Sequence, residues 1–222
     1  MYIVVDERSI VTAGYVASFN REGVPSLGLF SSEFQDWLES ASRADLEAVQ
    51  GFLLGDFAQR LTCAEAIRRH SKAPIIALSE VRSLQQTLEL FTASFDDVVA
   101  KPVHVREILA RSEAIWRRMN AGQLPAEGER LKVFFDGRDP QVDGEALILP
   151  RRERHILEYL VRNRGRRLTK TQIFNATYGI YSNDVEESVI EGHVSKLRKK
   201  LRARLGYDPI EAKRYIGYTF TG

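Results

Sequence analysis

Residues 189–204 read VIEGHVSKLRKKLRAR, and this stretch decides the fold of the C-terminal part of the chain. Its apolar residues recur at spacings of four, three and four, which places them on one face of a helix: Ile190, Val194, Leu197 and Leu201. Small and cationic residues fall mainly on the opposite side: Gly192, Ser195, Lys196 and Lys199. From Lys196 to Arg204 there are six basic residues and no acid. A helix held by one apolar face, with small and cationic residues on the other, suits the major groove of duplex DNA.

The segments on either side of this helix predict a helix-turn-helix followed by a hairpin. Residues 151–162 place an apolar stripe on one helix face. Thr169 and Gln172 have the spacing of a capping box and open a second, short helix. Residues 210–220 read as a terminal hairpin, and residues 131–149 read as a small antiparallel meander with tight turns.

An isolated basic run is as often a solvated helix face as a binding surface. Here further basic residues accompany it in the same unit: Arg162, Arg164, Arg166, Arg167, Lys213 and Arg214. Three basic clusters on one such unit favour binding of duplex DNA over a role in solubility alone. RNA is a weaker alternative, because the basic helix offers no aromatic stacking platform.

The first half of the chain alternates short apolar runs with amphipathic stretches. Strands are expected at residues 2–5, 48–54, 74–78 and 97–100. Helices are expected at residues 9–22, 32–41, 57–70, 82–93 and 104–119. Ser32 and Gln35 have capping-box spacing at the start of the second helix. Alternating strands and helices of this length predict a doubly wound, flavodoxin-like parallel sheet with helices on both faces.

The segment MNAGQLPAEGER, residues 119–130, is small and polar and contains Pro and Gly, which is typical of a linker. It would divide the chain into a domain at 1–118 and a domain at 131–222. The predicted fold class is therefore α/β plus α+β, a flavodoxin-like domain followed by a winged helix-turn-helix domain.

Composition narrows the class of protein. Of the 222 residues, those at 1–120 include 13 basic and 16 acidic side chains, a net charge of −3, whereas the rest include 19 and 14, a net charge of +5. This asymmetry suggests that one half receives a signal and the other contacts a polyanion. The single cysteine, Cys63, the absence of a signal peptide and the lack of an apolar run near 20 residues suit a cytoplasmic protein off the membrane. No phosphate loop, metal-spaced His/Cys set or credible nucleophile–base pair points to an enzyme or to a cofactor.

The C-terminal segments ERHILEYLVRNRGRRLTKTQIF, VIEGHVSKLRKKL and AKRYIGYTF resemble the effector domain of OmpR/PhoB-type response regulators. The resemblance covers about residues 131–222 and implies that the basic helix is the recognition helix and the hairpin a wing that enters the minor groove. It implies base-edge or near-base positions for Gly192, Lys196 and Arg198, with Ser195 small enough to permit close approach. Its other implied DNA contacts are phosphate positions at His193 and Lys199 and the wing arginine at Arg214. Lys213, the neighbouring basic residue of the hairpin, is a further candidate for a DNA contact. His193 could equally be a structural hydrogen-bonding residue.

The N-terminal half resembles the receiver domain of the same family. Asp6 and Glu7 match its acidic pair, Ser79 closes PIIALS at its hydroxyl position, and Lys101 with the following proline matches its lysine–proline pair. Counting back from Pro74, the phosphate acceptor falls at Gly51, which has no carboxylate. The aromatic switch residue is also missing, because Val98 stands there. The nearest acid, Asp56, is expected in the next loop, away from that point, and tight magnesium binding is not expected.

These features predict a phosphorylation-independent, sequence-specific transcription regulator with an atypical receiver. The resemblance implies a homodimer formed through the receiver, tandem half-sites on promoter DNA and contact with RNA polymerase. A contact face around Leu90, Phe91, Val105 and Leu109 is possible, although each of these residues is more simply part of the core. The whole chain also resembles the flagellar transcriptional regulators of alphaproteobacteria, which implies activation of flagellar genes. The alternative is a conventional phosphorylation-controlled regulator with a non-standard acceptor.

Overall fold

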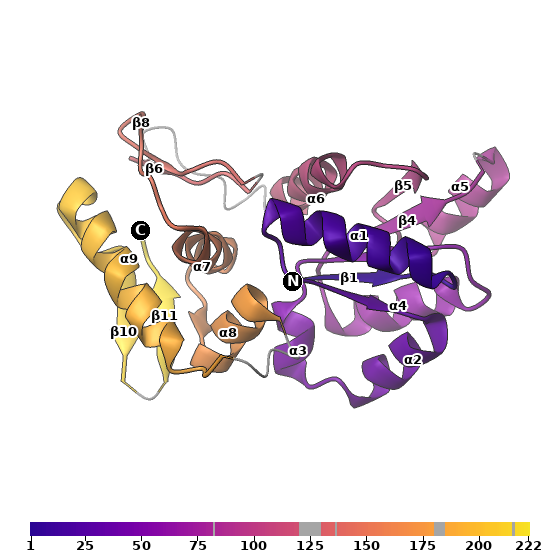
Figure 1. The fold of residues 1–222 in the computed structure, drawn as a ribbon, viewed down its shortest axis with the longest axis horizontal. Coiled ribbons are helices and arrows are strands. Elements are labelled where there is room, and N and C mark those ends of the chain that lie inside the picture. The colour runs from indigo at the N-terminus through magenta and orange to yellow at the C-terminus, as the bar shows by residue number, and fades with distance from the viewer. Residues whose placement is uncertain (82, 120–129, 136, 180–184, 215) are drawn as a thin grey trace. The chain divides into compact units, whose positions relative to one another are not determined.

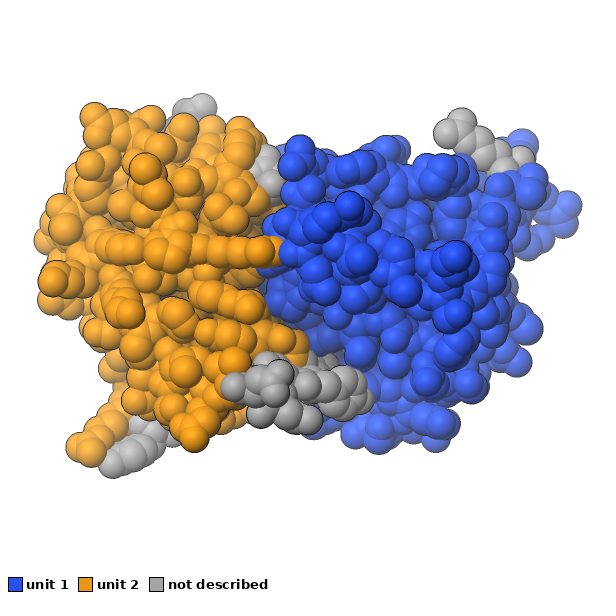
Figure 2. Space-filling view, in the orientation of Figure 1, with its two compact units in different colours: residues 1–121 blue, residues 122–222 orange. Residues whose placement is uncertain are grey.

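The computed structural model describes residues 1–222 except 82, 120–129, 136, 180–184 and 215. The chain divides into two compact units, residues 1–121 and residues 122–222, which are drawn in different colours in Figure 2. Their boundary falls inside the linker predicted at 119–130. Met119 ends a helix, and residues 120–129 lie outside the described residues, so the linker stays a prediction.

The first unit is a five-stranded parallel sheet in the order β2-β1-β3-β4-β5, with helices on both faces (Figure 1). Its strands are β1 (Tyr2–Val5), β2 (Ser26–Leu29), β3 (Gly51–Leu54), β4 (Ile75–Ser79) and β5 (Asp97–Ala100). Its helices are α1 (Ser9–Glu22), α2 (Ser31–Ser40), α3 (Arg43–Ala48), α4 (Arg60–His70), α5 (Leu84–Thr92) and α6 (Val105–Met119). This order confirms the predicted flavodoxin-like fold.

Both faces of this sheet are packed, because neighbouring residues of a strand point to opposite sides. Leu53 of β3 joins a buried core with Phe19 of α1 and Ile108 of α6. The next residue towards the start of the strand, Phe52, meets Phe34 of α2 edge to face, with ring centroids 6.2 Å apart. The alternation therefore assigns α1 and α6 to one face of the sheet and α2 to the other.

Two elements of this unit were not located in the sequence, and one helix cap was misplaced. The edge strand β2 and the short helix α3 account for residues 26–29 and 43–48. Helix α3 ends at Ala48, which shortens the strand expected at 48–54 to Gly51–Leu54. At the start of α2, the backbone N–H of Phe30 donates to Glu33 Oε2 at 2.8 Å, so the expected cap by Ser32 and Gln35 is wrong.

The second unit is a winged helix-turn-helix. Its helices are α7 (Arg151–Arg162), α8 (Lys170–Tyr178) and α9 (Val189–Leu205), and its wing hairpin is β10 (Ile210–Lys213) and β11 (Gly217–Phe220). Strand β9 (Arg167–Leu168) pairs antiparallel with β11. The predicted meander is a separate antiparallel sheet of β6 (Leu131–Lys132), β7 (Gln141–Val142) and β8 (Glu145–Ala146).

A helix cap and a glycine determine how α8 begins and how β11 approaches β9. Thr169 Oγ1 accepts from the backbone N–H of Gln172 at 3.2 Å, and Gln172 Oε1 accepts from that of Thr169 at 2.8 Å, which confirms the capping box at α8. Gly217 has a φ of +138°, and a Cβ there would lie 2.0 Å from the carbonyl oxygen of Leu168. Only glycine therefore allows β11 to approach β9 so closely. Among the described residues, every helix is too short or too polar to cross a bilayer.

Candidate functional site

The basic helix α9 is anchored as its sequence predicts. Its apolar residues are buried, with exposed fractions of 0 to 2 %: Ile190, Val194, Leu197, Leu201 and Leu205. The predicted small and cationic residues are exposed: Gly192, Ser195, Lys196 and Lys199. A side chain added at Gly192 would meet no other atom within 4 Å. The helix therefore presents an open stripe that is small near its N-terminus and cationic further along.

Arg198 lies beside this stripe and not on it. It is half-buried, and its Nε and Nη2 lie 3.0 and 2.8 Å from Asp208 Oδ2. Arg202 donates to the same oxygen at 2.6 Å. The two guanidinium groups hold the pKa of the Asp208 carboxyl below its usual range despite the opposing effect of burial. A base contact by Arg198, as the resemblance implies, requires this side chain to leave Asp208.

His193 is tied to the neighbouring helix. Its Nε2 lies 2.8 Å from the hydroxyl of Tyr178 at the end of α8. The guanidinium of Arg152 stands 4.3 Å from the centre of the Tyr178 ring. Burial is the main cause that lowers the pKa of His193, and nearby Lys196 and Arg152 act in the same direction. The contacts of His193 favour the structural role that the sequence left open.

The wing residues Lys213 and Arg214 are both exposed at the turn end of β10. Within the hairpin, Lys213 of β10 pairs with Gly217 of β11. Behind the hairpin, Arg167 of β9 pairs with Glu211 at 3.2 Å. The unit thus offers cationic groups on α9 and on its wing.

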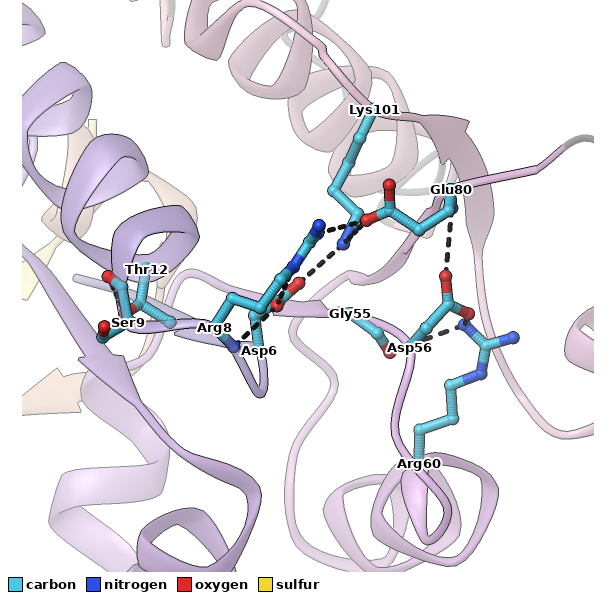
Figure 3. A network of polar contacts seen from close by, with 9 residues as sticks. All are labelled: Asp6, Arg8, Ser9, Thr12, Gly55, Asp56, Arg60, Glu80 and Lys101. Atoms are coloured by element: carbon cyan, nitrogen blue, oxygen red, sulfur yellow. Dashed lines mark hydrogen bonds and ion pairs between the residues drawn. The ribbon is translucent and has the colours of Figure 1, made fainter.

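A second cluster of polar groups lies at the carboxyl ends of β1, β4 and β5 (Figure 3). Lys101 Nζ lies 2.6 Å from Asp6 Oδ2 and 2.7 Å from Glu80 Oε1. Arg8 donates to Asp6 Oδ1 from its backbone N–H at 3.0 Å and from Nε at 3.3 Å, and its Nη2 donates to Glu80. We call these four residues, Asp6, Arg8, Glu80 and Lys101, the pocket network.

Electrostatics stabilise the charged form of each member. Burial alone would raise the pKa of Asp6, but hydrogen bonds and charge from Lys101 and Arg8 outweigh it and lower that pKa. Burial likewise opposes the charge of Lys101, yet its bonds to Asp6 and Glu80 raise its pKa. The Lys101 hydrogen bond is the main cause that lowers the pKa of Glu80. The two carboxylates are therefore matched by two cations.

Gly51 does not lie at this pocket, so the sequence-based placement of the acceptor position is wrong. Gly51 begins β3 and pairs with Tyr2, and a Cβ there would meet the Tyr2 ring at 2.6 Å. Leu54 ends β3 and pairs with Val5, which brings the next residue, Gly55, beside Asp6. A Cβ at Gly55 would lie 2.4 Å from Asp6 Oδ2. The position facing the acidic pocket is thus a different glycine, and it also lacks a carboxylate.

Asp56 follows Gly55 and comes closer to the network than expected from the sequence. Its Oδ2 accepts from the backbone N–H of Glu80 at 3.0 Å, and its other oxygen pairs with Arg60 of α4 (Figure 3). Its carboxylate supports the loop that carries Glu80. Glu7, the second acid of the predicted pair, is exposed.

The groups at this pocket do not fit a bound magnesium ion. Both oxygens of Asp6 already face cations, with Oδ2 at 2.6 Å from Lys101 Nζ and Oδ1 at 3.3 Å from Arg8 Nε. Gly55 supplies no further carboxylate, and hard divalent cations need several oxygen ligands. Among the described residues there is also no group of three or more His, Cys, Asp or Glu placed to hold a metal ion.

Comparison with known proteins identifies the family. The chain is 53% identical to the flagellar transcriptional regulator FtcR of Brucella abortus (strain 2308) over 222 residues, which is 98% of each protein. The chain belongs to the FtcR family of flagellar transcriptional regulators. Residues 144–220 match the family described as "Transcriptional regulatory protein, C terminal". The protein is therefore a transcriptional regulator with an OmpR-type DNA-binding domain and not an enzyme.

Two more distant proteins are also similar to this chain. The regulatory protein VanRB of Enterococcus faecalis is 33% identical over 151 residues, 68% of this chain and 66% of that protein. The solved response regulator DrrB of Thermotoga maritima is 21% identical with a TM-score of 0.42, and the match covers 100% of this chain and 98% of DrrB.

The structure brings together Asp6 and Lys101 as predicted, and adds residues that the sequence did not single out. Arg8 and Glu80 complete the pocket network, and Asp208 holds the arginines of α9. Glu80 follows Ser79 directly at the carboxyl end of β4. A polar residue at that end of a parallel strand was a usable signal, because such ends meet at one edge of the sheet.

Proposed function

We propose that this chain is a cytoplasmic regulator that binds promoter DNA sequence-specifically and activates flagellar genes without phosphorylation of its receiver-like unit. The observation that carries the DNA-binding part is the exposed stripe of α9, with Gly192, Ser195, Lys196 and Lys199 opposite a fully buried apolar stripe. The flagellar part rests on the 53% identity to FtcR of Brucella abortus.

In the proposed complex, α9 lies in the major groove. Gly192 and Ser195 allow close approach, Lys196 reaches base edges, and Lys199 contacts a phosphate. Lys213 and Arg214 bring the wing to the neighbouring minor groove. Two such units on tandem half-sites about one helical turn apart then present the regulator to RNA polymerase.

Independence from phosphorylation is supported by the composition of the pocket. Gly55 cannot be phosphorylated, and the space next to it is taken by the carboxylate of Asp6. Lys101, which could otherwise pair with an incoming phosphoryl group, already contacts Asp6 and Glu80. The ion pairs of the network supply in advance the charge neutralisation that a phosphoryl group would otherwise require.

The proposed homodimer uses the receiver-like unit, but of the four residues suggested by the sequence only Phe91 is exposed. Leu90, Val105 and Leu109 are buried and belong to the core. Helix α5 instead exposes apolar residues at spacings of four and three, with exposed fractions of 77 % for Leu84, 58 % for Leu88 and 48 % for Phe91. An apolar stripe of this kind suits a two-fold contact with a second copy.

The DNA-binding part is tested by fluorescence anisotropy with a promoter fragment and a random duplex over a range of salt concentrations. Lys199→Gln is expected to weaken binding to both duplexes and to lower the salt slope by about one. Lys196→Gln is expected to weaken the specific duplex more than the random one. Lys72→Gln, an exposed lysine of the first unit, is the control and should change neither. Equal loss on both duplexes for Lys196→Gln and Lys199→Gln would contradict sequence readout by α9.

Phosphorylation at Asp56 is the second candidate, because this acid adjoins Gly55 and contacts the Glu80 backbone. Intact-mass spectrometry after treatment with acetyl phosphate tests it directly. A phosphoryl adduct on Asp56, together with tighter DNA binding in the presence of beryllofluoride, would replace the phosphorylation-independent mechanism. Absence of any adduct would contradict phosphorylation at Asp56 and support regulation without a phosphoryl group.

A further inference from the structure

The basic residues of α9 differ in whether an acid neutralises them. Six basic residues lie between positions 196 and 204. Four of them are paired with carboxylates of the same unit at distances of 2.6 to 2.8 Å: Arg198, Lys200, Arg202 and Arg204. Among the described residues, no ion pair involves Lys196 or Lys199. A polyanion can therefore contact these two lysines without displacing a carboxylate.

Acids of two other elements neutralise one edge of the helix. Glu153 of α7 accepts from Lys200, and Glu145 of β8 accepts from Arg204, each at 2.8 Å. The side chain of Glu145 is 78 % exposed, so this carboxylate lies at the surface of the unit. Its pairing with Arg204 joins the small sheet of β6, β7 and β8 to the C-terminal part of α9.

Asp208 neutralises the other edge. It lies in the segment between α9 and β10, and its Oδ2 accepts from both Arg198 and Arg202, at 2.8 and 2.6 Å between the Nη2 atoms and Oδ2. Its other oxygen, Oδ1, accepts from the backbone N–H of Ile210 at 3.2 Å. One carboxylate, held at the start of the wing, thus serves two guanidinium groups.

The paired cations border the exposed stripe on both sides. Residues four positions apart lie on the same edge of a helix with about 3.6 residues per turn, so positions 200 and 204 share one edge and positions 198 and 202 the other. Lys196 and Lys199 lie between these edges, on the face opposite the buried apolar stripe. The ion pairs therefore cancel positive charge at the edges of α9 and leave it along the middle.

Paired and unpaired cations contribute differently to DNA binding. Contact with phosphates releases counterions and gives a sequence-independent affinity that grows with the number of phosphates neutralised. A cation that must first leave a carboxylate loses an ion pair, so its contact with a phosphate gains little. On random DNA a protein can adopt whichever register gives the most phosphate contacts, whereas base contacts fix the register on the specific site. Unpaired cations at the edges of α9 would therefore strengthen random binding more than specific binding.

We propose that Glu145, Glu153 and Asp208 are specificity-determining residues that keep the edge cations of α9 from random-sequence DNA. They act through the cations with which they pair, and so they limit affinity that carries no sequence information. The inference rests on the proposed function, because it takes α9 as the helix that contacts DNA. It assigns part of the specificity to carboxylates that lie outside the recognition helix.

Two substitutions remove these carboxylates with little change in shape. Glu145→Gln removes the ion pair of Arg204, and Asp208→Asn removes those of Arg198 and Arg202 while it keeps the oxygen that accepts the backbone hydrogen bond. Fluorescence anisotropy of the full chain with a random duplex is expected to show tighter binding at about 0.1 M salt, by about threefold for Glu145→Gln and about tenfold for Asp208→Asn. The salt slope is expected to increase by about one and by about two, respectively.

A promoter fragment and two further variants separate this effect from others. Affinity for the promoter fragment is expected to rise less than affinity for the random duplex, so the preference for the promoter fragment falls. Asp208→Glu keeps the negative charge and should bind the random duplex as the parent protein does. Glu65→Gln makes the same change of charge at an exposed acid of the first unit and should leave both affinities and the salt slope unchanged.

The inference is overturned if Glu145→Gln and Asp208→Asn bind the random duplex no more tightly than Glu65→Gln does. Equal gains on the two duplexes also overturn it, because the acids would then limit affinity without affecting specificity. Damage to the fold would weaken binding to both duplexes, which is opposite to the expected gain. A parent protein that does not prefer the promoter fragment contradicts the proposed function, whereas a parent that does, with variants that gain nothing on the random duplex, contradicts this inference alone.

Discussion

The two clusters of charge in this protein are arranged in opposite ways. On α9, Lys196 and Lys199 are exposed, and the charges of the stripe face outward. In the pocket network, Lys101 and Asp6 have side chains only 8 % and 3 % exposed and satisfy one another. Charges that face water can exchange their counterions for a phosphate backbone, whereas charges already paired inside a protein cannot. The difference separates a surface built to bind from a pocket built to hold loops together.

Under the proposed function, this contrast explains how one unit can bind DNA while the other needs no phosphorylation. A recognition helix needs its buried stripe and its outward side chains, and both are present in α9. A phosphate-accepting pocket needs an excess of negative charge to bind a divalent cation, and the bound cation then offsets the negative charge of the phosphoryl group. Here Arg8 and Lys101 remove that excess, because they match the charges of Asp6 and Glu80.

The largest effect is expected from Gly217→Val, which disrupts the close approach of β11 to β9 in the DNA-binding unit. The new Cβ would lie 2.0 Å from the Leu168 carbonyl oxygen at a φ of +138° that valine avoids. We expect the C-terminal unit to lose about 3 kcal/mol of unfolding free energy, measured by urea denaturation. Gly192→Ala is the matched control, since its Cβ meets no atom within 4 Å. Removing a helical glycine should stabilise the same unit by about 0.5–1 kcal/mol. Equal effects of the two substitutions would refute the close approach of β11 to β9.

A smaller but still large effect is expected from Lys101→Met, which breaks the pocket network. Asp6 would stay buried with Arg8 as its remaining cationic partner. We expect the receiver-like unit to lose about 2–3 kcal/mol of unfolding free energy, because a buried carboxylate loses its main partner. Lys72→Met, at an exposed lysine of the same unit, should change stability by less than about 0.5 kcal/mol. If Lys101→Met were as mild as this control, the network would not hold the loops together.

The sequence predicted the parts of the fold that depend on local periodicity and failed where tertiary contacts decide. The α9 stripe and the Thr169 cap are local patterns, and both are confirmed. The acceptor position was placed at Gly51 by counting along loops, whereas the register of β1 with β3 brings Gly55 beside Asp6. A count back from Pro74 assumes a length for the segment between β3 (Gly51–Leu54) and β4 (Ile75–Ser79), and only the register of the sheet fixes which residue reaches the pocket.

The pocket network itself could not be read from periodicity. Arg8 and Glu80 are 72 positions apart, and Asp6 and Lys101 are 95 positions apart. Only the order of the parallel sheet brings these loops to one edge. The residues could be suspected from their places after strands, but their pairing depends on side-chain geometry that the sequence does not contain.

The smallest effect expected is on the acid side of the stability profile of the receiver-like unit. The pKa of Asp6 is lower in the folded protein than its usual value of 3.8, so the unfolded chain takes up this proton first as the pH falls. The stabilisation by Asp6 is therefore complete above its unfolded pKa and is lost as the pH falls through its folded pKa. Glu80, whose pKa is also lowered, acts in the same direction.

Urea midpoints of this unit measured between about pH 5 and about pH 3 should accordingly fall, and the fall should be shallower in Asp6→Asn than in the parent protein. Glu7→Gln changes an exposed neighbouring acid, and its urea midpoints should depend on pH as those of the parent protein do. An acid profile that Asp6→Asn does not alter would mean that Lys101 and Arg8 do not stabilise the ionised Asp6. In that case the ion pairs of the pocket network would not stabilise the folded unit, and the contrast with the outward-facing charges of α9 would disappear.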